Sequence, residues 1–143
     1  MTTHEMQEFV PYTPEQIYAL VIDIEQYPEF IPWCRGARII SRNQNSFLGE
    51  LIIAFKHIRE SYVSRVHGDE KAMRIHVEME RGPFHHLINK WYFEEMDGGC
   101  MIHFHIDFAF KSKILNKIIG SLFGRAQRKM VGAFKTRADD LYS

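Results

Sequence analysis

The sequence predicts an α+β domain in which a curved antiparallel sheet of seven strands wraps around one long C-terminal helix, with two short helices after the first strand. From Ala37 to Phe110, apolar and polar residues alternate between turn sequences, as in strands joined by short connections. After Ser112, apolar residues recur at three- and four-residue spacing, as in an amphipathic helix. Because the apolar face of an antiparallel sheet needs a cover, the long helix is expected to lie on it.

The N-terminal region predicts one strand and two small helices. A short strand is expected at Glu5–Val10. Thr13 follows as an N-cap, and Gln16 is placed to complete a capping box, which predicts a first helix over Pro14–Ile22. Asp23 can cap a second, shorter helix through Gln26.

The middle of the chain predicts a meander of strands. One strand alternates from Phe47 to Phe55, and the next places Ile58, Tyr62 and Val66 on one face before a hairpin turn at Gly68–Lys71. Further strands are expected at Met73–Met79, Asn89–Glu95 and Cys100–Phe110, and the last of these places Ile102, Phe104, Ile106, Phe108 and Phe110 on one face.

The C-terminal helix is expected to begin after Ser112, its N-cap, and to run for about 30 residues, or about 45 Å. Its apolar stripe includes Met130 and Phe134. Gly120 and Gly124 each cost about 1 kcal/mol relative to alanine inside a helix. Their presence predicts a kink, or a place where the helix backbone approaches a neighbour closely.

Composition narrows the classes of function. The chain has 143 residues, which predicts one domain over residues 1–143. Its 18 basic and 18 acidic side chains balance, so the net charge offers no general attraction for nucleic acid or anionic lipid, and no DNA partner is expected. Cys34 and Cys100 have no metal or redox spacing and are expected to be free thiols in a reducing cytoplasm.

Four segments carry a resemblance to a known family: "VPYTPEQIYALVIDIEQYPEFIPWC", "GPFHHLINKWYF", "IHFHIDFAFKSKIL" and "MVGAFKTRADDLY". Together they resemble the coenzyme Q-binding branch of the START-like superfamily, which also includes a bacterial ribosome-association toxin and polyketide-cyclase-like proteins. The resemblance implies a helix-grip fold around a lipid cavity. Trp33 favours the quinone-binding branch, because the toxin branch usually lacks this tryptophan.

The segment "YPEFIPWC", Tyr27–Cys34, has too much apolar surface for an ordinary loop. In a helix-grip fold this segment lies over the cavity mouth, so Phe30, Ile31 and Trp33 are expected to form an apolar lid over a ligand. The alternative is that these residues plug the open end of the sheet as anchors of the loop. The resemblance favours the lid.

A second wall of the cavity mouth is expected at "GPF", Gly82–Phe84, where the sheet bends. Ordinary core packing is the alternative for each aromatic residue taken singly. The residues expected to contact the ligand are Phe30, Trp33, Tyr62, Phe84, Trp91, Phe93, Phe104, Phe108, Met130 and Phe134. The oxygens of a quinone only accept hydrogen bonds, so donors are needed, and the candidates are Tyr18, Tyr62, Trp33 and Trp91.

Metal binding and catalysis are weaker interpretations. His103, His105 and Asp107 have a spacing that can hold zinc, but they alternate with the apolar face and are expected outside, with no further ligand cluster in the sequence. No nucleophile elbow, phosphate-binding loop or dinucleotide fingerprint is present. Glu60 is the one carboxylate that the strand phase places inside, unless a bulge resets the register.

The resemblance therefore implies a protein that is not an enzyme and that binds ubiquinone, or a similar polyprenyl lipid, to support respiratory electron transport. Ubiquinone would be a bound ligand, and no covalent cofactor is expected. The basic residues of the C-terminal helix also allow peripheral contact with the inner face of an anionic bacterial membrane. The alternatives are a toxin that binds the large ribosomal subunit and a polyketide-cyclase-like enzyme with a titratable group in its cavity.

Overall fold

The computed structural model describes residues 2–55 and 58–143, which form one antiparallel sheet, two α-helices and a short 3-10 helix. The strand order is β1-β7-β6-β5-β4-β3-β2, so the first strand pairs with the last and every other neighbour is consecutive. The strands are β1 Thr2–Val10, β2 Cys34–Arg42, β3 Ser46–Phe55, β4 Ile58–Asp69, β5 Arg74–Arg81, β6 Phe84–Met96 and β7 Gly99–Phe110. The predicted seven-stranded helix-grip architecture is confirmed.

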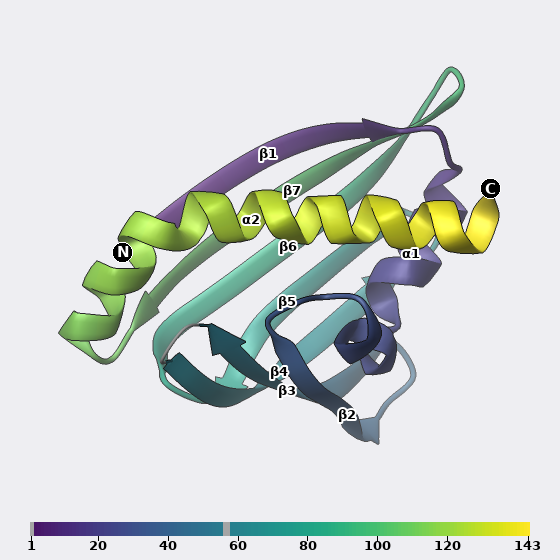
Figure 1. Ribbon diagram of the computed structural model, residues 1–143. Coiled ribbons are helices and arrows are strands. Elements are labelled where there is room, and N and C mark those ends of the chain that lie inside the picture. The colour runs from purple at the N-terminus through teal and green to yellow at the C-terminus, as the bar shows by residue number, and fades with distance from the viewer. Residues whose placement is uncertain (1, 56–57) are drawn as a thin grey trace.

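The helices lie on one face of the strongly curved sheet (Figure 1). The long helix α2, Lys113–Tyr142, crosses the concave face, while α1, Pro14–Ile22, and the 3-10 helix η1, Ile24–Glu29, gather near its C-terminal end. Within the described residues, no helix combines the length and the apolar character needed to cross a membrane.

Local hydrogen bonds explain where the helices begin. The Gln16 amide donates to the Thr13 hydroxyl at 3.1 Å, and the Gln16 side chain accepts from the Thr13 amide at 3.0 Å, which is the predicted capping box. The Leu115 amide donates to Ser112 Oγ at 3.2 Å, as predicted for the start of α2. Asp23 makes no side-chain cap, and the second small helix is a 3-10 helix rather than an α-helix.

Helix α2 is attached to the rest of the fold at both ends. Near its start, the Asn116 side chain donates to the Phe110 carbonyl at 2.9 Å and accepts from the Phe110 amide at 2.7 Å. Near its end, Tyr142 donates to the Gln16 carbonyl at 3.1 Å, and Tyr12 donates to Asp139. These contacts fix the helix to β7 at one end and to the region around α1 at the other.

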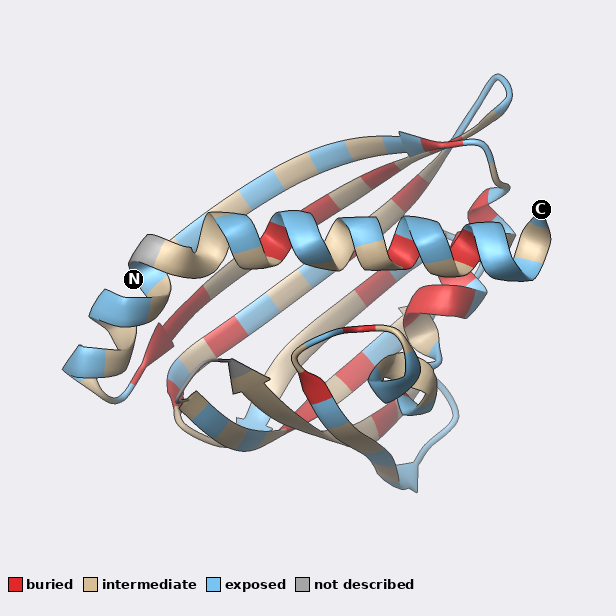
Figure 2. Ribbon diagram, viewed as in Figure 1, coloured by how far each residue is buried: buried red, intermediate tan, exposed pale blue. Residues whose placement is uncertain are grey.

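Two clusters of buried apolar residues form the core, one toward each end of α2 (Figure 2). The larger cluster joins α1, η1 and the sheet to Phe134 and Ala138 on α2. The smaller cluster consists of Phe84, Leu87, Phe108 and Phe110, against which Leu115, Ile119 and Phe123 of α2 pack. The inward faces predicted for the strands are confirmed by the residues that supply these clusters.

Several predicted boundaries are wrong. Strand β1 begins at Thr2 rather than Glu5, because its pairing with β7 extends to Phe108. The turn between β4 and β5 lies at residues 70–73 rather than Gly68–Lys71, because β4 continues to Asp69 and β5 begins only at Arg74. The Asp69 carboxylate accepts from the Ala72 amide at 3.1 Å, which stabilises the later turn. Strand β6 begins at Phe84 rather than near Asn89, because pairing with β7 resumes directly after the bend.

Gly120 and Gly124, two of the three glycines of α2, show one of their two predicted effects. The first turns of α2 run at an angle to the rest of the helix (Figure 1), and glycine is a common site of such kinks. The predicted close approach is wrong at Gly120, because a Cβ atom there would meet nothing within 4 Å. At Gly124 the nearest atom is Arg128 Nη1, at an ordinary 3.7 Å.

Candidate functional site

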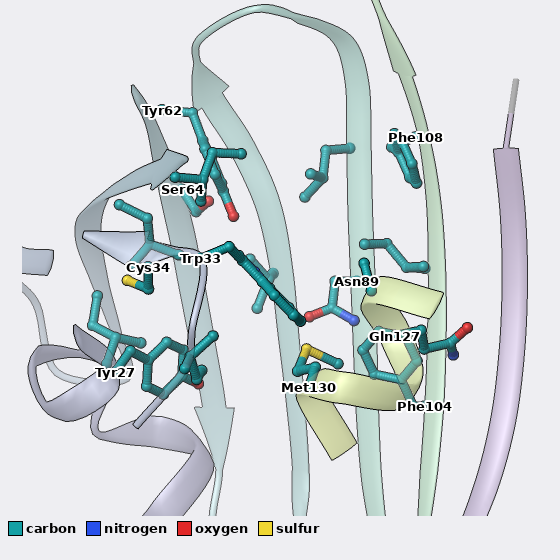
Figure 3. Close-up of a pocket in the computed structure, with 18 of the residues that line it drawn as sticks. Tyr27, Trp33, Cys34, Tyr62, Ser64, Asn89, Phe104, Phe108, Gln127 and Met130 are labelled. Carbon is teal, nitrogen blue, oxygen red and sulfur yellow. The ribbon is translucent and has the colours of Figure 1, made fainter. Parts of the chain in front are cut away.

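A cavity of about 240 Å³ lies between the concave face of the sheet and α2, and it is partly open to solvent (Figure 3). Residues of both core clusters line it. The sheet contributes alternate residues of β3 to β7, since successive side chains of a strand point to opposite faces. Helix α2 contributes a stripe at three- and four-residue spacing: Ile119, Leu122, Phe123, Ala126, Gln127, Met130 and Phe134.

Most of the residues that the sequence predicts at the ligand site lie together around this cavity. They are Trp33, Tyr62, Phe84, Trp91, Phe104, Phe108, Met130 and Phe134. They come from the loop before β2, from β4, β6 and β7, and from α2, so the fold brings together segments that are far apart in the chain. Ligand contact by each of them stays a prediction.

Phe30 and Phe93 do not line the cavity. Phe93 is only 1% exposed and packs edge-on against Tyr18, with ring centroids 6.2 Å apart. Its position in β6 is correct, but α1 covers that end of the strand, so the ring lies in the core. Phe30 packs edge-on against Phe134 at 5.3 Å and against Tyr27 at 5.9 Å, and the Arg137 guanidinium lies over it at 5.1 Å.

The aromatic loop, Tyr27–Cys34, has features of both predicted roles, the lid over the cavity and the plug at the open end of the sheet. Ile31 and Trp33 line the cavity, as expected for a lid. Phe30, between Tyr27 of η1 and Phe134, anchors the loop to α2, as expected for a plug. Tyr27 contributes to both, because its ring lines the cavity while its hydroxyl donates to the Val21 carbonyl.

The structure ranks the four predicted hydrogen-bond donors. Trp91 Nε1 already donates to Asn89 Oδ1 at 2.8 Å, and Tyr18 is not among the residues that line the cavity. Tyr62 and Trp33 line the cavity and have no hydrogen-bond partner for their donor groups within residues 2–55 and 58–143. These two donors are therefore free to meet a ligand.

Three polar residues of the lining were not predicted: Ser64, Asn89 and Gln127. Asn89 is fully engaged, since its amide also donates to the His105 carbonyl at 2.9 Å. Ser64 and Gln127 are 4% and 8% exposed, and among the described residues neither Ser64 Oγ nor Gln127 Nε2 has a hydrogen-bond partner. The strand phase that places Tyr62 inside also places Ser64 inside, and the α2 stripe includes position 127, so both signals were present in the sequence.

The described part of the cavity lining is uncharged. No aspartate, glutamate, lysine, arginine or histidine is found among the described residues that line it. Burial raises the pKa of the Tyr27, Tyr62 and Cys34 side chains above their ordinary values, so all three stay protonated at neutral pH. The lining therefore offers hydroxyl and thiol protons, but no base.

Glu60, expected inside from the strand phase, is half-buried and is not among the residues that line the cavity. Its neighbours in phase, Ile58 and Tyr62, do line it. The expectation that a carboxylate enters the interior is therefore wrong for the described part of the lining.

The histidines of β7 lie on the outer face of the sheet, as predicted. His103 Nε2 lies 2.9 Å from Glu94 Oε1, and His105 Nδ1 lies 3.9 Å from Glu5 Oε1. Asp107 Oδ1 lies 3.3 Å from His86 Nε2. These pairs join neighbouring strands, and the described residues contain no group of three or more side chains suited to hold a metal ion.

Residues 10–135 match the family described as polyketide cyclase / dehydrase and lipid transport. The chain belongs to this family. The match covers the capped helix α1, strands β2 to β7 and most of α2, and these elements supply most of the residues that line the cavity. It confirms the START-like resemblance drawn from the sequence.

Three proteins with similar sequences are informative about the family. The ribosome association toxin RatA of Rickettsia prowazekii is 39% identical, over 99% of this chain and 99% of that protein. A mitochondrial coenzyme Q-binding protein of Dictyostelium discoideum is 31% identical, over 99% of this chain and 71% of that protein. The solution structure of an 18 kDa protein of Caulobacter crescentus is 34% identical, with a TM-score of 0.84 and 99% of each chain covered.

Proposed function

We propose that the protein is a non-enzymatic carrier of ubiquinone, or of a similar polyprenyl lipid, that supports respiratory electron transport. The observation that carries this proposal is the neutral, largely aromatic and aliphatic cavity beneath α2. Such a cavity attracts an apolar guest, because each buried methylene contributes about 0.8 kcal/mol. The similarity to a coenzyme Q-binding protein over nearly the whole chain supports the same class of ligand.

The size of the cavity suggests how such a ligand is held. Pockets for drug-sized ligands measure roughly 300–1,000 Å³. At about 240 Å³, this cavity suits the ring and the first part of a prenyl tail. A longer tail then leaves through the opening, where the apolar surfaces of Ile31 and Trp33 are available to it.

The absence of charged side chains from the described lining also supports a carrier over an enzyme. General acid–base catalysis needs a group whose pKa lies near the working pH. The titratable groups found in the described lining are tyrosines and a cysteine whose pKa values are raised by burial. We therefore do not propose cyclase chemistry, although the family description includes cyclases.

The proposal is tested by extracting the ligand. The protein is purified from a quinone-producing bacterial host, extracted with organic solvent and analysed by mass spectrometry, with a Trp91→Glu variant as the control with a charged cavity. We expect a prenylated quinone from the natural protein and much less from the variant. Clean extracts from both, together with no binding of added quinone, would contradict the proposal.

The comparisons favour a second candidate, association with the large ribosomal subunit. A relative that is 39% identical is named a ribosome association toxin. Six cations of the region from β7 to α2 are exposed and have no ion-pair partner within the described residues: Lys111, Lys113, Lys117, Arg125, Arg128 and Lys129. Such a basic face suits phosphate groups. Co-sedimentation with the large subunit, and growth arrest on overexpression, would support this candidate.

The carrier is expected to work in the bacterial cytoplasm, at the inner face of the membrane. A quinone with a long prenyl tail resides in the bilayer, so a protein that loads it must reach the membrane surface. The same exposed cations suit anionic lipid headgroups. Fractionation of cells that produce the protein at natural levels, with and without a high-salt wash of the membranes, tests this location.

A further inference from the structure

We propose that Tyr62 and Ser64 on β4 form the subsite that binds the oxygen atoms of the ligand and thereby orients its ring. This inference rests on the proposed carrier function and adds the residues that recognise the polar end of the guest. It also predicts that the guest is a ketone or quinone rather than a plain hydrocarbon.

Strand β4 contributes both side chains to the cavity lining. Residues two apart on a strand share a face and are about 7 Å apart along the strand. Tyr62 and Ser64 therefore point to the same side, and both line the cavity. Figure 3 shows them on one wall, across the cavity from Gln127, whose amide end is turned away from Trp33.

The hydroxyl of Ser64 is the feature that indicates a polar ligand atom in the cavity. It is almost fully buried in an apolar wall and has no hydrogen-bond partner in the part of the chain that the structure describes. A buried polar group without a partner destabilises the folded protein, so such groups are rare unless a ligand or another function uses them. A serine hydroxyl rotates about a single bond and can turn toward an acceptor in the cavity.

Tyr62 supplies the second donor. Its ring packs edge-on against Phe84 at 5.3 Å, which holds the side chain in place. Because burial raises its pKa, the hydroxyl keeps its proton at neutral pH and can donate it to an acceptor. Two other donors of the lining are already engaged, since Cys34 donates to the Gly36 carbonyl at 3.5 Å and Tyr27 donates to the Val21 carbonyl.

The chemistry of a quinone fits such a pair of donors. Its carbonyl oxygens accept hydrogen bonds and donate none. A prenyl tail makes no hydrogen bonds and is indifferent to a hydroxyl in the wall. The pair therefore places the ring against β4 and leaves the aromatic and aliphatic remainder of the cavity to the tail.

The test compares two ligands on four variants. The variants are Tyr62→Phe, Ser64→Ala, the double variant, and Ser61→Ala, an exposed residue of the same strand that serves as the matched control. Each is titrated with a short-chain ubiquinone and with the corresponding prenyl hydrocarbon that lacks the ring. We expect each single change to weaken quinone binding about 5-fold and the double change about 25-fold, with hydrocarbon binding unchanged.

Thermal unfolding without ligand provides a second measurement. Ser64→Ala removes an unpartnered hydroxyl, so its melting temperature is expected to equal or exceed that of the natural protein. A clear drop would mean that Ser64 is held by a structural bond, and would overturn the inference. If the natural protein binds quinone and the variants bind it equally well, the inference alone fails. If the natural protein binds no quinone, the proposed function fails and the inference fails with it.

Discussion

Phe30 and Trp33 belong to one loop but have different surroundings, and their substitutions should differ accordingly. Phe30→Ala removes a ring that packs against Tyr27 and Phe134, so we expect a loss of about 2 kcal/mol in the free energy of unfolding. Trp33→Ala removes a half-buried wall of the cavity, so we expect about 1 kcal/mol or less, but weaker ligand binding. Urea unfolding and ligand titration of both variants measure the difference.

The outcome that would contradict this assignment is a cooperative loss of the fold in Trp33→Ala. In that case the whole loop is a plug, and its contribution to the cavity is incidental. A conservative Trp33→Phe variant keeps the apolar contact while shortening the side chain, and it provides the control for size.

A second prediction at this scale concerns pH. Burial raises the pKa of Cys100 from about 9 to about 11, so between these values the thiol stays protonated in the folded state while it ionises in the unfolded chain. The unfolded state then binds fewer protons, and stability falls as pH rises. The stabilising contribution is complete below about pH 9 and is lost as pH rises through about 11, at up to about 1.4 kcal/mol per pH unit.

Urea unfolding at several pH values measures this slope. Cys100→Ala removes the ionising group, so the variant should be less stable at neutral pH but should show a flatter dependence between pH 9 and 10. Parallel curves for the two proteins would contradict the assignment, because the tyrosines contribute equally to both.

Individual residues were the least predictable level of this structure. The phase of a strand correctly placed Tyr62 and Trp91 inside, but phase alone cannot say that α1 covers Phe93 or that Glu60 stays out of the cavity. Those outcomes depend on how the elements pack. Ser64 is hard to predict as a cavity residue, because a small polar side chain adds nothing to the hydrophobic pattern, although the strand phase places it on the same face as Tyr62.

Within the elements, local sequence signals were reliable. The capping box fixed the start of α1, and Ser112 fixed the start of α2, because both depend on neighbouring residues alone. The clamp between Asn116 and Phe110 joins two elements and has no such local signature. The turn after β4 was misplaced for a similar reason, since several residues there favour turns.

The glycines give a prediction at the scale of the element. Gly120 is exposed within α2, and a Cβ atom there would meet open space, so Gly120→Ala should stabilise the protein by about 1 kcal/mol through helix propensity. Gly99→Ala is the matched contrast, because its Cβ atom would lie 2.0 Å from the Val10 carbonyl oxygen and must displace backbone. Chemical unfolding of both variants measures the change in the free energy of unfolding, which should rise for Gly120→Ala and fall for Gly99→Ala.

If Gly120→Ala instead destabilises the protein, the kink in the first turns of α2 needs a conformation that alanine resists. Circular dichroism of the variant then shows whether helix content is lost. An unchanged helix content with lower stability would place the cost in the contacts between α2 and the sheet.

At the scale of the whole molecule, the zero net charge hides an uneven distribution of charged residues along the chain. Residues 111–138 contain eight of the 18 basic residues and no acidic residue, so all 18 acidic residues lie elsewhere and the neutral chain is strongly polarised. The charge-reversal variant Arg125→Glu, Arg128→Glu and Lys129→Glu should lose attachment to anionic vesicles and should keep its ligand, because these residues are exposed and outside the cavity.

Vesicle sedimentation at rising salt measures this attachment, and neutral vesicles provide the control. Unchanged binding by the variant would contradict a role for this face at the membrane. Loss of ribosome binding in the variant, with vesicle binding intact, would instead favour the second candidate function.

The attachment of α2 at its two ends has a further consequence. The hydrogen bonds that join α2 to the rest of the fold lie near its two ends, at Asn116 and Asp139, and the span between them crosses the cavity with apolar contacts. We expect larger guests to be admitted by outward bowing of this span, with both anchors intact. The same protein would then bind ligands of different widths. The volume of the empty cavity would be smaller than that of the largest ligand that the protein can carry.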